Sequence, residues 1–130
     1  EEFEIALADL GTKHHIELPV ELNAMNGTYA IHSLLKLDTV GEKQKLFKLI
    51  ADYAAVVDRC DGAFTSNGAE GRLKANAAWA TLTDEQSALF EQVRAIFDPF
   101  GTLNPGVKQK TEMRSLVATL RTGYTTADML

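Results

Sequence analysis

A glutamate and a histidine that are predicted to face each other on a β-hairpin form the first candidate site for chemistry. Glu21 and His32 fall on one face of that hairpin, together with Asn23, Met25 and Thr28. A carboxylate beside an imidazole can act as a general base or supply half of a metal site. The alternative is a solvated sheet face that carries one ordinary Glu–His pair. Both interpretations depend on the register of the hairpin.

A polar loop with two glycines, residues 65–72 (TSNGAEGR), is the second candidate. Glycine lets a ligand approach the backbone closely, although ordinary turn chemistry explains the same residues equally well. We interpret His14 and His15 as structural, because adjacent side chains on a strand point apart and chelate poorly. Cys60 and Trp79 are interpreted as packing residues, the first on an apolar helical stripe and the second in an alanine-rich stretch.

The hairpin is predicted over residues 16–37, because apolar and polar residues alternate on both sides of Asn26-Gly27. A two-residue loop at this dipeptide pairs Met25 with Thr28 and therefore Glu21 with His32. The apolar residues then share the opposite face of the sheet. They are Ile16, Leu18, Leu22, Ile31, Leu35 and Leu37.

Four helices are predicted from apolar residues at helical spacing. The first covers residues 2–10 and ends at Gly11. The second starts at the capping box Thr39–Glu42 and ends at Gly62, and the third starts at the box Thr83–Gln86 and ends before residue 98. The last covers residues 113–120, and residues 63–66 predict a short strand. This order indicates an α+β fold whose antiparallel sheet carries helices on one face, a ferredoxin-like unit that lacks its first strand.

The composition excludes several classes of function. A length of 130 residues favours one domain, and a net charge of -5 argues against nucleic acid as a partner. The single cysteine, Cys60, excludes an internal disulfide and predicts a cytoplasmic location. The last segment from residue 99 has four Lys/Arg and two Asp/Glu, so a peripheral association with the inner face of the membrane is an alternative.

Three stretches carry a resemblance to a known family. Residues 96–106, IFDPFGTLNPG, resemble the FDPxGxLNPG ending of FAD-linked oxidases, the group that includes D-lactate dehydrogenases, glycolate oxidase and D-2-hydroxyglutarate dehydrogenases. Residues 65–74, TSNGAEGRLK, resemble the SGEHGxGRLK loop of that family, and residues 27–32, GTYAIH, resemble its GDGNLH strand. The stretches occur in the order that the family shows.

The resemblance implies that residues 1–108 are the C-terminal cap domain of a two-domain FAD-dependent oxidoreductase and that residues 109–130 are a helical tail. The expected partners are the enzyme's own N-terminal FAD-binding domain and a small 2-hydroxy acid. FAD is expected in the full-length parent only, so the isolated chain should be inactive. A homodimer through the exposed sheet edge is a further expectation, because the missing first strand leaves backbone groups unpaired.

His32 matches the second histidine of the family's strand motif and is the expected catalytic residue. Asn104 and Arg72, from the ending and from the loop, are the expected contacts to flavin or substrate.

Two of the family's three metal ligands are replaced by Met25 and Asn67, and Gly68 stands where the family has its catalytic histidine. Methionine and amide side chains are poor ligands for hard or borderline divalent ions. We therefore predict no metal at His32. The alternative function is a ferredoxin-like binding or interaction module without flavin.

Overall fold

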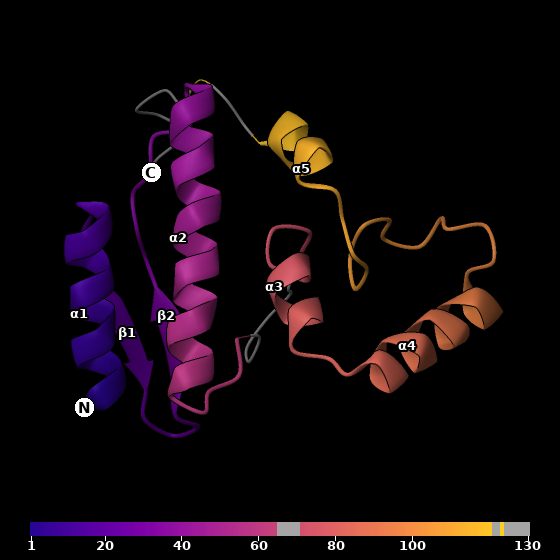
Figure 1. Ribbon diagram of the computed structural model, residues 1–130, viewed down its shortest axis with the longest axis horizontal. Helices are drawn as coiled ribbons and strands as arrows, with labels where there is room; N and C mark the ends of the chain where they lie inside the picture. Colours follow the sequence, from indigo (N-terminus) through magenta and orange to yellow (C-terminus); the bar gives the residue numbers. More distant parts are fainter. Residues whose placement is uncertain (65–70, 121–122, 124–130) are drawn as a thin grey trace. The chain divides into compact units, whose positions relative to one another are not determined.

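The computed structural model describes residues 1–64, 71–120 and 123, and the chain divides into two compact units. The first unit comprises residues 1–67 and 117–130, and the second comprises residues 68–116. The α+β class with an antiparallel sheet is confirmed (Figure 1). The elements in chain order are α1 (Glu2–His14), β1 (Val20–Asn23), β2 (Thr28–Ile31), α2 (Val40–Arg59), α3 (Ala75–Ala80), α4 (Asp84–Phe97) and α5 (Met113–Thr119).

The hairpin forms where it was predicted, but the predicted register is wrong. Strands β1 and β2 pair Asn23 with Thr28 and Glu21 with Ala30, so the partner of Glu21 is displaced by two residues from His32. The predicted strands over residues 16–37 are also too long, because the ladder of β1 and β2 covers only residues 20–31.

The turn explains the shift in register. The loop has four residues, 24–27, and the side chain of Asn23 at its start accepts a hydrogen bond from the Met25 amide at 3.1 Å. Asn26 accepts another from the Thr28 amide at 3.1 Å, which is the local turn that asparagine favours. Only Gly27 of the dipeptide has a positive φ, whereas the predicted two-residue turn requires it at both positions. Met25 therefore lies in the loop and not on the sheet face.

A displacement of two residues leaves every side chain on its predicted face, but only part of the apolar face is buried. Ile16, Leu18, Ile31 and Leu35 pack against the core, whereas Leu22 is 49% exposed. Helices α1 and α2 pack against each other and supply the buried core residues Leu7, Leu10 and Leu49. Partly buried residues from the two helices, from β2 and from the segments next to the hairpin pack against them. They are Phe3, Ile16, Leu18, Ile31, Leu35 and Tyr53. The core of the first unit therefore lies between the helices and one face of the hairpin.

Helix α1 continues past Gly11 to His14, so the predicted end at Gly11 is wrong. A side chain at Gly11 would place its Cβ 2.9 Å from the carbonyl oxygen of Ile16, whose amide donates a hydrogen bond to the Gly11 carbonyl. The glycine thus serves a close approach of the returning chain rather than the end of the helix. His15 takes the left-handed conformation that ends α1, with φ 55°.

Helix α2 has the predicted capping box between Thr39 and Glu42. Its end has the hydrogen bonds of a Schellman motif, with the Gly62 amide donating to the Val57 carbonyl, although Asp61 and not Gly62 adopts the positive φ. The apolar residues at helical spacing predict a buried stripe of Leu46, Ile50, Tyr53, Val57 and Cys60. Leu46 and Val57 are buried, the other three are partly buried, and Leu49 and Val56 are buried in addition.

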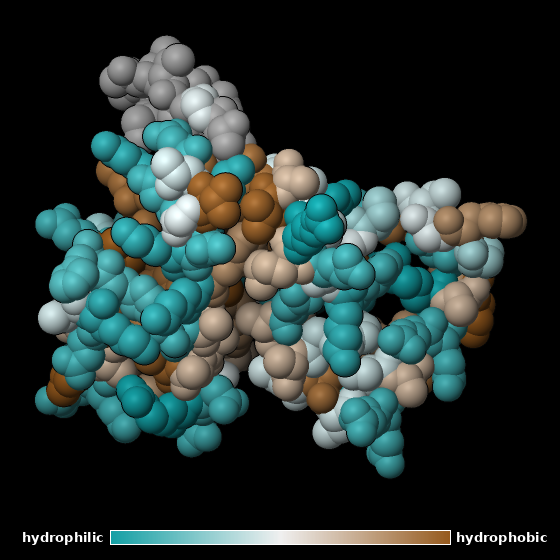
Figure 2. All heavy atoms as spheres, turned by 45° about the horizontal axis from the view of Figure 1, so that its top comes forward, coloured by the Kyte–Doolittle hydropathy of each residue, from teal (hydrophilic) through white to brown (hydrophobic). Residues whose placement is uncertain are grey.

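The second unit contains α3 and α4 and most of α5. Ala75, Trp79 and Leu116 are buried there, and the Trp79 ring lies 6.0 Å from the Phe90 ring, as expected for a packing tryptophan. Helix α4 has the predicted capping box but no buried residue. Apolar side chains therefore lie at the surface, where Figure 2 shows them in brown among polar ones. Those on α4 are Leu89, Phe90, Val93, Ile96 and Phe97.

Two further expectations concern the remaining segments. Ala63 and Phe64 are not in a strand, and the rest of the predicted strand, residues 65–66, lies outside the described residues. The predicted last helix is confirmed as α5. Among the described residues, no helix is both long and apolar enough to span a membrane.

Candidate functional site

The segment that follows α4, residues 98–107, is the most tightly organised loop of the second unit. Its sequence is DPFGTLNPGV, and its backbone turns sharply, with positive φ at Gly101, Asn104 and Gly106. Asn104 adopts φ 45°, a conformation that a residue with a side chain rarely takes unless its surroundings hold it there. We call residues 98–107 the LNPG turn.

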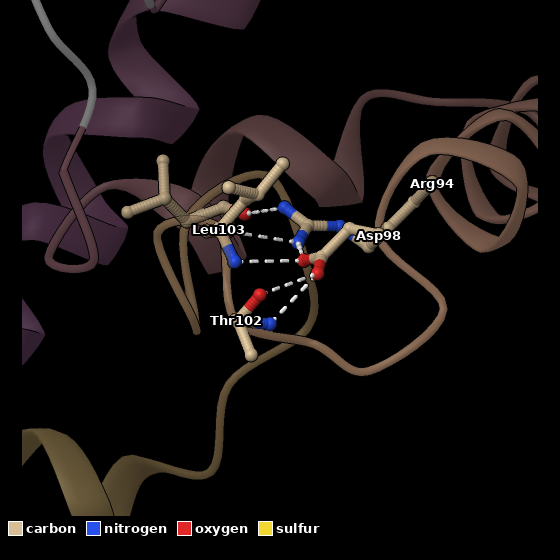
Figure 3. A network of polar contacts seen from close by, with 5 residues as sticks. Arg94, Asp98, Thr102 and Leu103 are labelled. Atoms are coloured by element: carbon tan, nitrogen blue, oxygen red, sulfur yellow. Dashed lines mark hydrogen bonds and ion pairs between the residues drawn. The ribbon is translucent and has the colours of Figure 1, made fainter.

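Asp98 organises the first half of the LNPG turn (Figure 3). Its carboxylate accepts hydrogen bonds from the Thr102 amide at 2.7 Å and from the Leu103 amide at 3.0 Å. Burial raises the pKa of this carboxyl, but the amides of Leu103 and Thr102, the Thr102 hydroxyl and the charge of Arg94 together hold the pKa below its ordinary value. Asp98 is thus an ionised cap whose contacts are all within the turn and its helix.

Arg94, one turn before the end of α4, pairs with Asp98 at 3.3 Å and binds the second half of the same turn. Its guanidinium donates to the carbonyl of Leu103 at 3.2 Å and to the carbonyl of Val107 at 2.6 Å. The family motif contains Asp98, but it does not predict this contact with Arg94. The signal was present as an Arg–Asp pair four residues apart, which is a spacing that brings helical side chains together.

Arg72 lies against the end of the LNPG turn. A Cβ added at Gly106 would be 3.3 Å from Cδ and 3.4 Å from Nε of Arg72, so the missing side chain of this glycine leaves the space that the arginine occupies. The residue is exposed, and it makes no ion pair with a described residue. The structure therefore brings Arg72 to the turn that carries Asn104. These two residues are the expected contacts to flavin or substrate.

Asn76 of α3 fixes the chain that leaves this turn. Its side-chain amide donates to the Thr111 carbonyl at 2.7 Å and accepts from the Thr111 amide at 2.8 Å. The Thr111 hydroxyl donates to the Gly106 carbonyl at 3.0 Å. The LNPG turn is consequently held from the α4 side by Arg94 and from the α3 side by Asn76.

His32, the expected catalytic residue, belongs to the first unit. Its Nε2 lies 3.2 Å from a carboxylate oxygen of Glu21, so the predicted pair exists, as a diagonal contact and not between directly opposite residues. Both side chains are mainly exposed, at 64% and 75%, which makes this an ordinary solvated pair.

The residues that the family uses as metal ligands are not assembled around His32. Met25 is 96% exposed in the hairpin loop, which corrects the prediction that it shares the face of His32. Asn67 and Gly68 lie outside the described residues. Among the residues described, no three His, Cys, Asp or Glu side chains are grouped as a metal would need. The absence of metal at His32 stays a prediction.

A second histidine contact was not anticipated. His14 Nε2 lies 2.8 Å from Oδ2 of Asp52, and Lys13 Nζ lies 2.8 Å from the same oxygen. Hydrogen bonds from Lys13 and then from His14 lower the pKa of the Asp52 carboxyl. His14 is the last residue of α1 and does not lie on a strand. Its ring joins α1 to Asp52 of α2, which is a structural role.

Residues 24–107 match the family described as FAD linked oxidases, C-terminal domain. The chain belongs to this family. As an FAD-linked oxidase C-terminal domain, it is part of an FAD-linked oxidoreductase whose N-terminal FAD-binding domain is its partner. The matched region begins in the hairpin loop and ends with the LNPG turn. No curated protein and no solved structure matches the chain.

The residues of the second unit fit one side of an FAD site. An exposed guanidinium and an asparagine amide can bind a carboxylate or the polar edge of a flavin ring. Arg72 and Asn104 are therefore the residues of this unit that would hold a polar group of the cofactor.

Proposed function

We propose that this chain is the substrate-side cap domain of an FAD-dependent oxidoreductase that acts on a small 2-hydroxy acid. Family membership and the position of Arg72 beside the LNPG turn support the proposal. A guanidinium binds a carboxylate through two parallel hydrogen bonds, and every 2-hydroxy acid carries that group. The exposed cation at the turn is the observation that carries the proposal.

In this function, Arg72 binds and orients the substrate carboxylate, and the Asn104 amide supplies a polar contact to flavin or substrate. For His32, which lies in the first unit and pairs with Glu21, the role of general base is proposed from its match to the family's strand motif alone. The bound flavin supplies the acceptor for the hydride that leaves the carbinol carbon. The products are then a 2-oxo acid, the reduced flavin and one proton on the base.

The full-length protein that contains this chain tests the proposal. Arg72→Met should raise KM for 2-hydroxy acids roughly tenfold or more, since a charge-assisted hydrogen bond contributes about 1.5–3 kcal/mol. His32→Gln should lower kcat by about 10²-fold or more at neutral pH. Arg114→Met, an exposed arginine on α5 of the second unit, is the matched control and should leave both constants unchanged.

The alternative function has a clear outcome in the same experiment. A full-length protein purified without flavin, and without turnover of any 2-hydroxy acid, would contradict the oxidoreductase proposal and favour an interaction module. A flavoprotein that oxidises other substrates would contradict only the substrate class.

The proposed assembly of the cap also includes a homodimer through a sheet edge. Within the described residues the sheet has two strands, and β1 is exposed along its whole length, so an added strand could pair with it. Leu22→Lys places a charge on this strand and should convert a dimer into a monomer in sedimentation experiments. A wild-type monomer at every concentration would contradict the dimer.

The cytoplasmic location rests on the unpaired thiol of Cys60 and stays a proposal.

A further inference from the structure

The guanidinium of Arg94 has a partner for each of its nitrogen atoms. Asp98 and the carbonyls of Leu103 and Val107 bind its two terminal nitrogens. With the Gln109 amide oxygen turned toward it, Gln109 also accepts from Nε at 3.0 Å and from Nη1 at 2.7 Å. An arginine whose donors are all used within its own domain is not available to bind a substrate.

The contacts of Arg94 and Asp98 converge on the residue that precedes Asn104. Asp98 accepts a hydrogen bond from the amide of Leu103, and Arg94 donates one to the carbonyl of the same residue. The peptide groups on both sides of Leu103 are therefore fixed by one ion pair, as Figure 3 shows. The second of these peptide groups also contains the amide nitrogen of Asn104.

Arg94 spans the turn around Asn104 as well. The two carbonyls that it binds, of Leu103 and Val107, lie before and after Asn104 in the chain. Asn104 has φ 45°, a left-handed conformation that asparagine adopts more readily than most residues and that the contacts of Arg94 support from both sides. Arg94 thereby constrains the backbone at Asn104 and the direction of its Cα–Cβ bond.

We propose that Arg94 is a positioning residue that sets the orientation of Asn104 toward flavin or substrate. This inference rests on the proposed function of Asn104 as a contact of the site. Arg94 does not touch the reacting atoms, and it acts through the peptide groups of the LNPG turn.

Lysine cannot replace Arg94 in this role. The contacts fall on three nitrogens of a planar group that point to different parts of the turn. An ammonium group keeps the charge opposite Asp98, but it presents its three donors from a single atom. Arg94→Lys therefore preserves the ion pair and removes the geometry, which separates positioning from charge.

The experiment uses the full-length flavoprotein and compares Arg94→Lys with Arg114→Lys, the matched exposed arginine. Arg94→Lys should lower kcat/KM roughly tenfold and change the flavin absorbance spectrum, whereas Arg114→Lys should change neither. The Val107 amide donates to the Asn104 carbonyl inside the segment that Arg94 spans, so its hydrogen exchange should accelerate by roughly tenfold in Arg94→Lys only. Gln109→Ala, which removes a single acceptor, is the milder variant if Arg94→Lys folds poorly, and it should show the same changes at smaller size.

A double variant tests the route of the effect. Asn104→Ala combined with Arg94→Lys should have nearly the kcat/KM of Asn104→Ala alone, because Arg94 acts through Asn104. Additive losses, or unchanged kinetics when the Val107 amide exchanges faster, would overturn the positioning role while leaving the proposed function intact. If the wild-type flavoprotein does not oxidise 2-hydroxy acids, the proposed function fails instead. Unchanged amide exchange in Arg94→Lys overturns the positioning role in either case.

Discussion

Helices α2 and α4 begin in the same way and end in different surroundings. Each starts with a capping box in which a threonine hydroxyl accepts from the amide three residues later. Each also has an apolar stripe at helical spacing. The stripe of α2 is buried against α1 and the hairpin, whereas α4 has no buried residue. Local signals thus determine where a helix begins, but the burial of its apolar face depends on what else is present to cover it.

The apolar residues of α4 stand out in the second unit. Leu89, Ile96 and Phe97 are 60%, 73% and 77% exposed, and the last two directly precede the LNPG turn. An exposed apolar face of this kind is typical of a surface that contacts another protein or domain.

Truncation of one side chain in each helix should give the largest contrast. Leu49→Ala in α2 removes a buried core residue and should lower the free energy of unfolding by about 2–5 kcal/mol. Val93→Ala in α4, on a residue that is 46% exposed, should lower it by less than about 0.5 kcal/mol in the isolated chain. Urea denaturation followed by circular dichroism measures both. Equal effects would contradict the contrast between the helices.

Two glycines that differ in their surroundings should respond in opposite directions to alanine. Gly11→Ala brings Cβ within 2.9 Å of the Ile16 carbonyl oxygen and should destabilise the first unit by about 1–3 kcal/mol. Gly41→Ala meets only the Thr39 hydroxyl at 3.9 Å and should stabilise α2 by about 0.4–1 kcal/mol. Thermal unfolding measures both variants. A stabilising Gly11→Ala would show that the chain at Ile16 can move away from the helix, and it would contradict the prediction.

The two capping boxes should contribute equally to the free energy of unfolding, although the two helices differ in burial. Thr39→Ala and Thr83→Ala each remove one side-chain acceptor from the first turn and should each cost about 1 kcal/mol. The fluorescence of Trp79, the single tryptophan, reports the second unit, and far-ultraviolet circular dichroism reports both. A cost confined to Thr39→Ala would mean that α4 is not formed in the isolated chain.

The pH dependence should be the smallest effect and should appear in both units. The pKa of Asp52 and the pKa of Asp98 both lie below the ordinary value of 3.8 in the folded chain. The stability that these carboxylates contribute is therefore present above that value and is lost as the pH falls through the folded pKa. Stability should be level from neutral pH to about pH 5 and fall below about pH 4. Asp52→Asn and Asp98→Asn should each flatten this fall, and a fall that begins near pH 6 would contradict the assignment.

Residue periodicity predicted the faces of the hairpin correctly, and turn chemistry predicted its register incorrectly. The faces depend only on alternation, which a displacement of two residues preserves. The register depends on whether Asn26 adopts a positive φ, and the side chains of Asn23 and Asn26 instead bind nearby amides. Those competing hydrogen bonds are local, but their relative strength cannot be judged from residue types alone.

The candidate site was predicted in part. The sequence resemblance identified Arg72 and Asn104, and the structure brings Arg72 to the turn that contains Asn104. The spacing of Arg94 and Asp98 indicates that the two side chains pair, but not that they hold the turn, because their other partners are mainly backbone groups. Every residue has a backbone carbonyl, so the residue type does not indicate which carbonyl accepts a side-chain hydrogen bond. For the same reason the amide clamp of Asn76 on Thr111 was not foreseen.

The uncovered face of α4 also bears on how the parent enzyme is made. A ribosome completes an N-terminal domain before a C-terminal one, and domains generally fold as units in that order. In an FAD-linked oxidase, the FAD-binding domain would be present when residues 84–97 emerge. The apolar face would then meet its partner during synthesis, whereas the same face released alone would favour self-association in a concentrated preparation.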